Sequence, residues 1–114
     1  MMRRARLRQS ARFQAMRSKG RWWSHRLIAL GVLANGLEIS RCGFSVSKKL
    51  GTAVARNRAR RRLREAVRQH WPDVAPGWDL VVAAREPLRD ATFADIQEGV
   101  RTLLGRAHLL RKDA

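Results

Sequence analysis

The stretch FSVSKKLGTAVARNRARRRLREAVR, residues 44–68, decides the fold of this 114-residue chain. It opens with alternating apolar and polar side chains, a pattern typical of a β-strand, and continues with the basic turn Lys-Lys-Leu-Gly at residues 48–51. From Thr52 onward the apolar residues follow helical spacing, and Pro72 ends that helix near His70. The sequence therefore predicts a strand, a basic turn and a long helix in direct succession.

The predicted helix has a narrow apolar stripe and is otherwise covered by arginine. Helical spacing places these residues in the stripe: Ala59, Leu63, Ala66, Val67 and His70. Seven arginines lie within residues 56–68, opposed by the single acid Glu65. Arg58 and Arg62 are like-charged neighbours at i,i+4, as are Arg60 and Arg64, and such pairs repel each other without an anionic partner. The pattern indicates a phosphate-rich partner, a nucleic acid.

The positive charge is concentrated in the first part of the chain. Residues 1–70 contain nineteen Lys or Arg and two acids, whereas residues 71–114 contain six and seven. We expect one domain over residues 1–114, with residues 1–8 as a mobile basic segment. Its binding surface then comes from the basic part of the chain.

Cysteine content and hydropathy favour a cytoplasmic protein that makes no use of a membrane. The single Cys42 cannot form an internal disulfide, and no charged-then-apolar leader with a cleavage site is evident. The longest apolar run, residues 27–34, is far shorter than the roughly 20 residues that span a bilayer. A membrane-surface role for the arginine helix is the weaker alternative, because its apolar face is narrow and contains Ala59 and Ala66.

Turn signals and apolar spacing predict the other elements. We expect a short helix ending at Gly20, strands at residues 22–25, 27–33, 38–47 and 78–84, and a last helix beginning near Thr92. The Asn35-Gly36 pair predicts a hairpin between the strands that flank it, because both residues tolerate positive φ. The order of elements predicts an α+β two-layer sandwich with an antiparallel hairpin and one helical crossover.

Residues 44–65 resemble the signature of the bacterial ribonuclease P protein family: a strand, a Lys-Lys-x-Gly turn and a helix that starts Arg-Asn-Arg. Weaker similarity extends through residues 7–20 and 79–87. The resemblance implies a small basic subunit that joins a catalytic ribonuclease P RNA and helps it to remove the 5′ leader of precursor tRNA. It further implies Mg²⁺ bound mainly by the RNA, no organic cofactor and no small-molecule substrate.

The resemblance also implies a fold in more detail than the spacing does. It indicates a four-stranded, mostly antiparallel sheet with flanking helices, the ribosomal protein S5 domain 2-like architecture. Its β-α-β crossover through the arginine helix is left-handed. Sequence patterns alone predict the much commoner right-handed crossover, so the left-handed sense rests wholly on the resemblance.

The family's RNA-contacting motif falls on basic residues of the turn and the helix and on one amide. By resemblance these are Lys48, Lys49, Arg56, Asn57, Arg58, Arg60, Arg61 and Arg62, with Arg64 and Arg68 extending the same surface. Lysines and guanidinia near a helix start are suited to phosphate. Asn57 is chemically different, and we expect it either to orient neighbouring side chains or to bind a base or a 2′-hydroxyl.

The resemblance further implies a leader-binding cleft lined by aromatic residues, between the first helix, the sheet face and the helix after it. Phe13 matches the first aromatic, Arg17 replaces the next, and Ile28 and Gly31 occupy sheet positions that often carry Phe or Tyr. We therefore assign precursor-leader binding to Phe13, Arg17 and Ile28. Stacking is worth about 1–3 kcal/mol per base, and with two aromatic platforms replaced we expect arginine to take over part of the leader binding.

Trp22 and Trp23 have two interpretations, as substitutes for the missing rings or as ordinary packing residues. Phe13 is open in the same way, since it also anchors the first helix. No catalytic constellation is visible, because His25, His70 and His108 lie far apart and no carboxylates cluster. Two alternatives stay open: a general RNA-binding module of ribosomal or chaperone type, and a self-contained metal nuclease.

Overall fold

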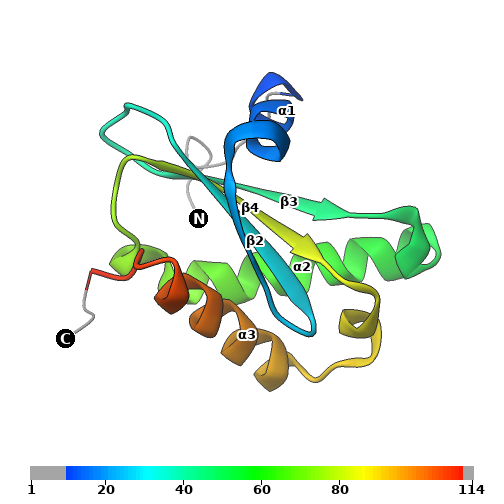
Figure 1. The fold of residues 1–114 in the computed structure, drawn as a ribbon. Helices are drawn as coiled ribbons and strands as arrows, with labels where there is room; N and C mark the ends of the chain where they lie inside the picture. The colour runs from blue at the N-terminus through cyan, green and yellow to red at the C-terminus, as the bar shows by residue number, and fades with distance from the viewer. Residues whose placement is uncertain (1–9, 112–114) are drawn as a thin grey trace.

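A computed structural model describes residues 10–111 of the chain (Figure 1). Its elements are α1 (Ser10–Lys19), β1 (Arg21–Ser24), β2 (Ile28–Ala34), β3 (Arg41–Val46), η2 (Lys48–Leu50), α2 (Ala53–His70), η3 (Trp71–Asp73), β4 (Trp78–Ala84), η4 (Glu86–Asp90) and α3 (Phe93–Arg106). The expected basic segment, residues 1–8, lies outside the described residues. The predicted helices and strands are present, with boundaries shifted by a few residues.

The four strands form one mixed sheet in the order β1-β2-β4-β3. β2 pairs antiparallel with both β1 and β4, and β3 pairs parallel with β4. The hairpin predicted at Asn35-Gly36 is wrong, because β4 lies between the two strands that this turn connects. Gly36 does adopt positive φ, at 70°. The loop after it carries the chain past the β4 position, and the hairpin of the sheet joins β1 and β2 instead.

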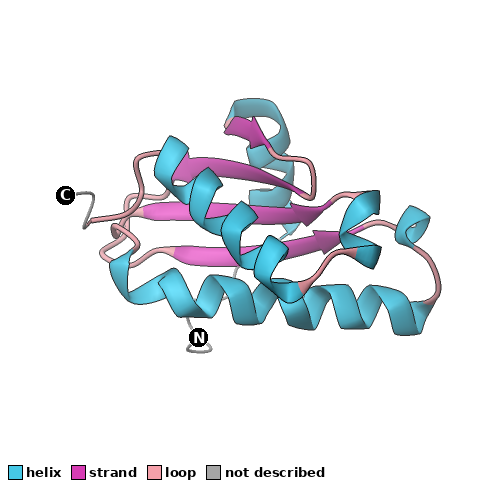
Figure 2. Cartoon of the chain, turned by 90° about the horizontal axis from the view of Figure 1, so that it is seen from below, coloured by secondary structure: helices cyan, strands magenta, loops and turns pink. Residues whose placement is uncertain are grey.

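The β3-α2-β4 segment is the predicted helical crossover. Figure 2 looks at the sheet from the side of α2 and α3 and shows that this crossover is left-handed, as the resemblance implies. Local chemistry sets the helix ends. Thr52 caps α2 by accepting a hydrogen bond from the Ala55 N–H at 3.1 Å, and Pro72 lies in the short η3 turn that follows.

The main core lies between the sheet and the layer formed by α2 and α3. Four of the five residues of the predicted α2 stripe are buried there, with Leu63 and Ala66 at 0% exposure, and His70 at the helix end is partly buried. From α3, Ile96 and Leu103 enter the same core. These two layers are the predicted sandwich, and α1 covers part of the opposite face of the sheet (Figure 1).

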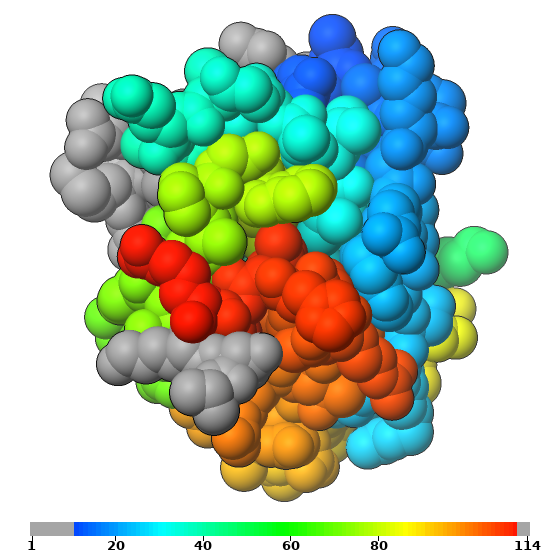
Figure 3. All heavy atoms as spheres, turned by 60° about the vertical axis from the view of Figure 1, so that its left-hand side comes forward, coloured from blue at the N-terminus to red at the C-terminus, as the bar shows by residue number. Residues whose placement is uncertain are grey.

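The end of α3 is fastened to the segment that precedes β4. Figure 3 shows the C-terminal residues (red) beside this segment (yellow-green), and Val74 forms an antiparallel bridge with Leu110. The Ala75 N–H donates to the Leu109 carbonyl at 2.7 Å. These contacts attach the C-terminal end of α3 to the segment before β4. The sides of α2 that face away from the core remain at the surface.

Candidate nucleic-acid interface

The arginines of α2 extend on three sides of its buried stripe. Spacing at i,i+4 places Arg58 and Arg62 along one flank, towards η4, while Arg61 lies on the crest away from the core. The other flank, towards β3, holds Arg56, Arg60 and Arg64. The arginines of α2 therefore surround its outer sides rather than forming a single stripe.

On the β3 flank, neighbouring groups orient the guanidinia. Arg60 donates through Nη1 to Oδ1 of Asn57 at 3.0 Å, so Asn57 takes the orienting role that was one of its two predicted roles. The Arg64 guanidinium carbon lies 5.8 Å from the ring centroid of Phe44 on β3. This contact fixes one arginine against the edge of the sheet.

On the η4 flank, the surface is hollowed. A depression of about 280 Å³ is lined by Thr52, Val54, Ala55, Arg58, Ala59, Arg62, Leu88, Arg89 and Asp90. Arg62 donates to the Ala91 carbonyl at 2.8 Å, which holds it in this wall. Burial and the adjacent Arg58 charge lower the pKa of Arg62, the expected sign for like charges brought together. This hollow can accept an anion.

Arg89 is a member of this hollow that sequence reasoning missed. Its guanidinium Nη1 lies 3.3 Å from where a Cβ on Gly51 would stand, so a side chain at residue 51 would crowd it. Gly51 also has a φ of 136°, which favours glycine. Arg89 lies just beyond the weakly similar stretch of residues 79–87 and between the acids Glu86 and Asp90, so no run of basic residues marks it.

The lysine turn precedes the start of α2. Lys48 and Lys49 form the short η2 turn, and both side chains are exposed. Ser47 caps the turn by accepting from the Lys49 N–H at 3.3 Å, while Leu50, 2% exposed, anchors it in the core. The predicted pair of lysines is thus held near the N-terminal end of α2, where backbone N–H groups also favour phosphate.

Arg68 differs from the other predicted RNA-binding residues. Its Nε donates to Oε2 of Glu65 at 2.7 Å, across one turn of the exposed helix face. The hydrogen bond from Arg68 lowers the pKa of Glu65, and the same bond raises the pKa of Arg68. The uncompensated charge of α2 is therefore concentrated in its N-terminal part, and Arg68 enters the interface already paired.

The α1 face of the sheet is organised by a buried carboxylate. Asp79 on β4 is 0% exposed and accepts from Arg12 Nε of α1 at 2.7 Å and from Arg41 Nη2 of β3 at 2.8 Å. The Asn35 amide adds a third donor at 3.0 Å. Burial by itself raises the pKa of Asp79, but the bonds from Arg41, Asn35 and Arg12 outweigh it and the pKa is lowered. This ionised group ties α1 to the sheet.

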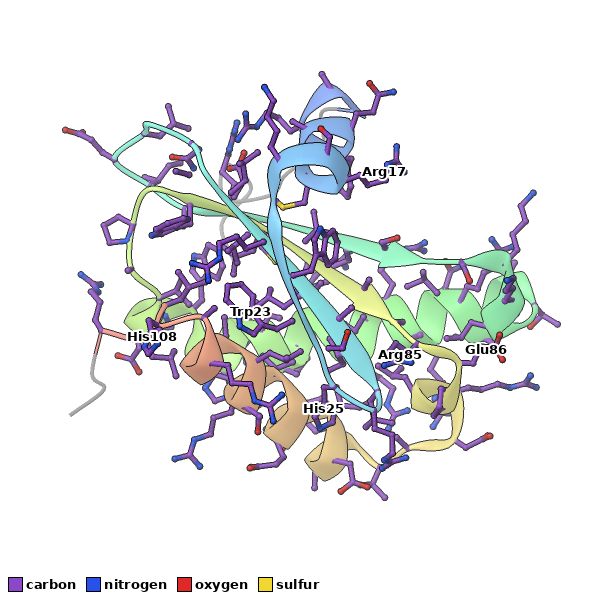
Figure 4. All side chains as sticks on the ribbon, in the orientation of Figure 1. Arg17, Trp23, His25, Arg85, Glu86 and His108 are labelled. Carbon is purple, nitrogen blue, oxygen red and sulfur yellow. The ribbon has the colours of Figure 1, made fainter. Side chains whose placement is uncertain are left out.

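Between α1 and the sheet lies a second hollow, of about 120 Å³. It is lined by Phe13, Met16, Arg17, Trp22, Ser45, Val81 and Ala83, so the structure brings the predicted residues Phe13 and Arg17 together. Figure 4 shows Arg17 on the α1 side of the sheet, and Trp23 and His25 on the side of α3. A basic and an aromatic side chain thus face one concave surface.

Ile28, the third residue predicted for this cleft, does not reach it. Its side chain is 1% exposed and lies in the main core, beside Leu30, Val67 and Val100. Ile28 belongs to the face of β2 that points to α2 and α3, so its assignment to leader binding is wrong. Gly31 lies on the α1 side of β2, directly opposite Trp22 in the β1–β2 ladder.

His25 and Cys42, which could in principle take part in catalysis, have contacts that are explained by the fold. The His25 Nδ1 accepts from the Leu27 N–H at 3.1 Å in the β1–β2 turn. The Cys42 thiol is packed in the core, and burial raises its pKa. Within residues 10–111, no three His, Cys, Asp or Glu side chains gather as a metal site. The same residues include no helix long and apolar enough to cross a membrane.

Comparisons with known proteins agree with this arrangement. A family model described as Ribonuclease P matches residues 1–108. The chain is 47% identical over 112 residues to the ribonuclease P protein component of Roseiflexus castenholzii, covering 97% of this chain and 92% of that protein. It is 36% identical to the corresponding protein of Clostridioides difficile, covering 90% and 91% of the two chains.

Solved structures give the same result for the fold. The RNase P protein of Staphylococcus aureus superposes with a TM-score of 0.85 at 34% identity, over 93% of this chain and 97% of that chain. The RNase P protein of Thermotoga maritima superposes with a TM-score of 0.81 at 30% identity, over 89% and 96%. With this sequence similarity over almost the whole chain and the same mixed sheet, the chain belongs to the ribonuclease P protein family.

Proposed function

We propose that this chain is the protein subunit of a bacterial-type ribonuclease P in the cytoplasm. Its partners are the catalytic ribonuclease P RNA and precursor tRNA, and its action is to promote endonucleolytic removal of the 5′ leader. The observation that carries the proposal is the arginine surface of α2. On one flank of this surface, Arg58 and Arg62 line a hollow together with Arg89 of η4. Such a surface fits closely spaced phosphates.

The chain has two surfaces that divide the work. The lysine turn and α2 bind the catalytic RNA, while the hollow with Phe13 and Arg17 binds the leader of precursor tRNA. They meet at β3, where Phe44 contacts Arg64 on one side and Ser45 lines the hollow on the other. A strand shared by both surfaces sets the distance between the two RNAs.

The subunit acts by binding and positioning, and the catalytic centre lies in the RNA. Among residues 10–111 no three His, Cys, Asp or Glu side chains gather. Mg²⁺ keeps most of its waters and needs few protein ligands, so the proposal assigns it mainly to the RNA. Magnesium held by the RNA supplies the hydrolytic chemistry. The cations of α2 neutralise phosphates where two polyanions approach, which replaces part of the Mg²⁺ needed for charge screening.

The test is 5′-end mapping of precursor tRNA cleavage at low and near-physiological Mg²⁺, with a bacterial ribonuclease P RNA alone and with this protein added. Accurate cleavage at low Mg²⁺ only when both are present is the expected result. Tight RNA binding without restored cleavage would support a general RNA-binding module instead. Cleavage by RNA-free protein with Mg²⁺ would support a self-contained nuclease.

A further inference from the structure

Trp22 lies over a glycine on the α1 side of the sheet. It is on β1, directly opposite Gly31 of β2 in the antiparallel register. A Cβ built on Gly31 would stand 2.7 Å from the indole carbons Cε2 and Cζ2. The ring of Trp22 thus fills the space above the sheet that any side chain at residue 31 would need. Gly31 is what allows the ring to lie there.

The indole ring is held in place without being covered. Its Nε1–H donates to the Met16 carbonyl at 3.2 Å, so the end of α1 fixes the ring's orientation. Nevertheless, 42% of Trp22 remains exposed. The adjacent Trp23 behaves in the opposite way, since it packs against the main core and Arg21 lies 5.3 Å from its ring centroid. Core packing explains Trp23, but it does not explain an oriented, open ring at residue 22.

The surroundings of the ring indicate what it can bind. Trp22 lines the hollow together with Phe13 and Arg17, above a floor that includes Ser45 and Ala83. None of the residues that line this hollow is acidic. An aromatic ring can stack on any of the four bases, and an exposed guanidinium can bind the phosphate of the same nucleotide. An aromatic ring beside an arginine therefore fits an unpaired nucleotide, whereas the positive charge of Arg17 would repel a cationic peptide.

We propose that Trp22, seated over Gly31, is the base-stacking platform for an unpaired nucleotide, with Arg17 contacting the adjoining phosphate. This inference rests on the proposed function, in which the nucleotide belongs to the 5′ leader of precursor tRNA. Trp22 is a binding and positioning residue that takes no part in the chemistry. The small residues of the floor leave the ring as the largest flat apolar surface available to a base.

The experiment uses the holoenzyme assembled with a bacterial ribonuclease P RNA. The dissociation constant is measured for precursor tRNA with a single-stranded leader and for mature tRNA without one, and the ratio of the mature value to the precursor value isolates leader binding. Trp22→Ala is expected to lower that ratio by about 5- to 100-fold, as for loss of stacking on one base. Affinity for mature tRNA and for the catalytic RNA should not change.

Two substitutions at residue 22 separate stacking from packing. Trp22→Phe keeps an aromatic face and should retain most of the leader preference, whereas Trp22→Leu still covers Gly31 and should lose it. A merely structural role predicts that leucine restores what alanine loses. The salt dependence gives a second readout, because stacking releases few counterions: Trp22→Leu should leave the salt slope of leader binding unchanged, and Arg17→Ala should flatten it.

A ring transfer tests the pairing with Gly31. The double variant Trp22→Ala with Gly31→Phe removes the ring from β1 and places a ring from β2 in the same space above the sheet. Its leader preference should therefore be higher than that of Trp22→Ala alone. If Trp22→Leu binds the leader like the parent in an active holoenzyme, the Trp22 inference is wrong and the proposed function stands. If the parent protein gives no holoenzyme activity, the proposed function itself fails.

Discussion

The two faces of the sheet differ in what holds them together and in what they expose. On the face of α2 and α3, a continuous apolar core sets the position of every element, and the charge is displaced to the outer sides of α2. On the face of α1, the apolar cluster is small, with Met16 and Val81 buried, and the Asp79 ion pairs fasten the helix. One face is therefore held by packing and the other by a few polar contacts, and this makes the second more sensitive to single changes.

Removing the Asp79 charge is expected to have the largest effect. Asp79→Asn leaves Arg12 and Arg41 without their carboxylate and should destabilise the fold by about 3 kcal/mol, since breaking a buried ion pair from one side is costly. Urea denaturation measures this. Glu38→Gln, at an exposed loop position, is the matched control and should change little.

Arg12→Ala refines the same test, because it removes the ion pair between α1 and Asp79 and leaves the pair between Arg41 and Asp79 in place. The Arg12 side chain is 28% exposed. The substitution should loosen α1 and weaken leader binding, while affinity for the catalytic RNA through α2 stays at the parent value. Equal losses at both surfaces would show that the two faces are not independent.

Acid should remove the Asp79 contribution by protonation. The pKa of Asp79 is lower in the folded chain than its unfolded value of about 3.9, so the unfolded state binds the proton more readily. The stabilisation is complete above about pH 4 and is lost as the pH falls through the folded pKa. The difference in unfolding free energy between the parent and Asp79→Asn should therefore shrink below pH 4. A difference that stays constant down to pH 2 would contradict the ionised state.

On the packed face, changing surface charge should affect RNA binding and leave stability intact. Arg58→Ala with Arg62→Ala should weaken binding of the catalytic RNA by about 2 kcal/mol and reduce the salt slope by about 1.5, if each arginine contacts one phosphate. Filter binding at several salt concentrations measures both quantities. The control is Arg101→Ala, an exposed arginine on α3. An unchanged slope in the double variant would count heavily against α2 as the RNA-binding surface.

The same contrast explains what the sequence could and could not predict. Helical period alone located the buried stripe of α2 and hence the arginines around it. The face of β2 was not accessible in this way, because residues 27–33 are almost continuously apolar and show no alternation. Ile28 was assigned to the cleft by resemblance, and the sequence pattern could not correct that assignment. Gly31, the other sheet position given by the resemblance, does lie on the α1 side, opposite Trp22.

Contacts distant in sequence account for the other errors. β4 inserts between β2 and β3 from more than 30 residues away, which the Asn35-Gly36 turn signal cannot reveal. Asp79 appears as a lone acid in an apolar strand, and its partners Arg12 and Arg41 lie 67 and 38 residues away. Local patterns therefore predicted the elements, while the register decided which side chains meet.

Arg89 tests whether the hollow on the η4 flank belongs to the RNA-binding surface. Arg89→Ala should weaken catalytic RNA binding by about 1 kcal/mol and reduce the salt slope by about 0.8, the value for one phosphate contact. Asp90→Asn, which removes the acid lining the same hollow, should act in the opposite direction. If neither variant changes the salt slope, the surface ends at Arg58 and Arg62 and does not include η4.

The smallest effect is expected at the paired end of α2. Glu65→Gln removes the carboxylate that holds Arg68, so the guanidinium becomes available to phosphate. RNA affinity should rise slightly, and the salt slope should steepen by less than about 0.9, since at most one contact is gained. The Arg68 and Glu65 side chains are 55% and 43% exposed, and an ion pair at the surface adds little stability, so thermal stability should stay near the parent value. Arg68→Ala in the parent background should then cost less affinity than Arg61→Ala, because Arg61 lies on the crest and the structure records no hydrogen bond or ion pair for it among the described residues. The reverse order would mean that Glu65 orients Arg68 for RNA instead of neutralising it, and the contrast between the two ends of α2 would disappear.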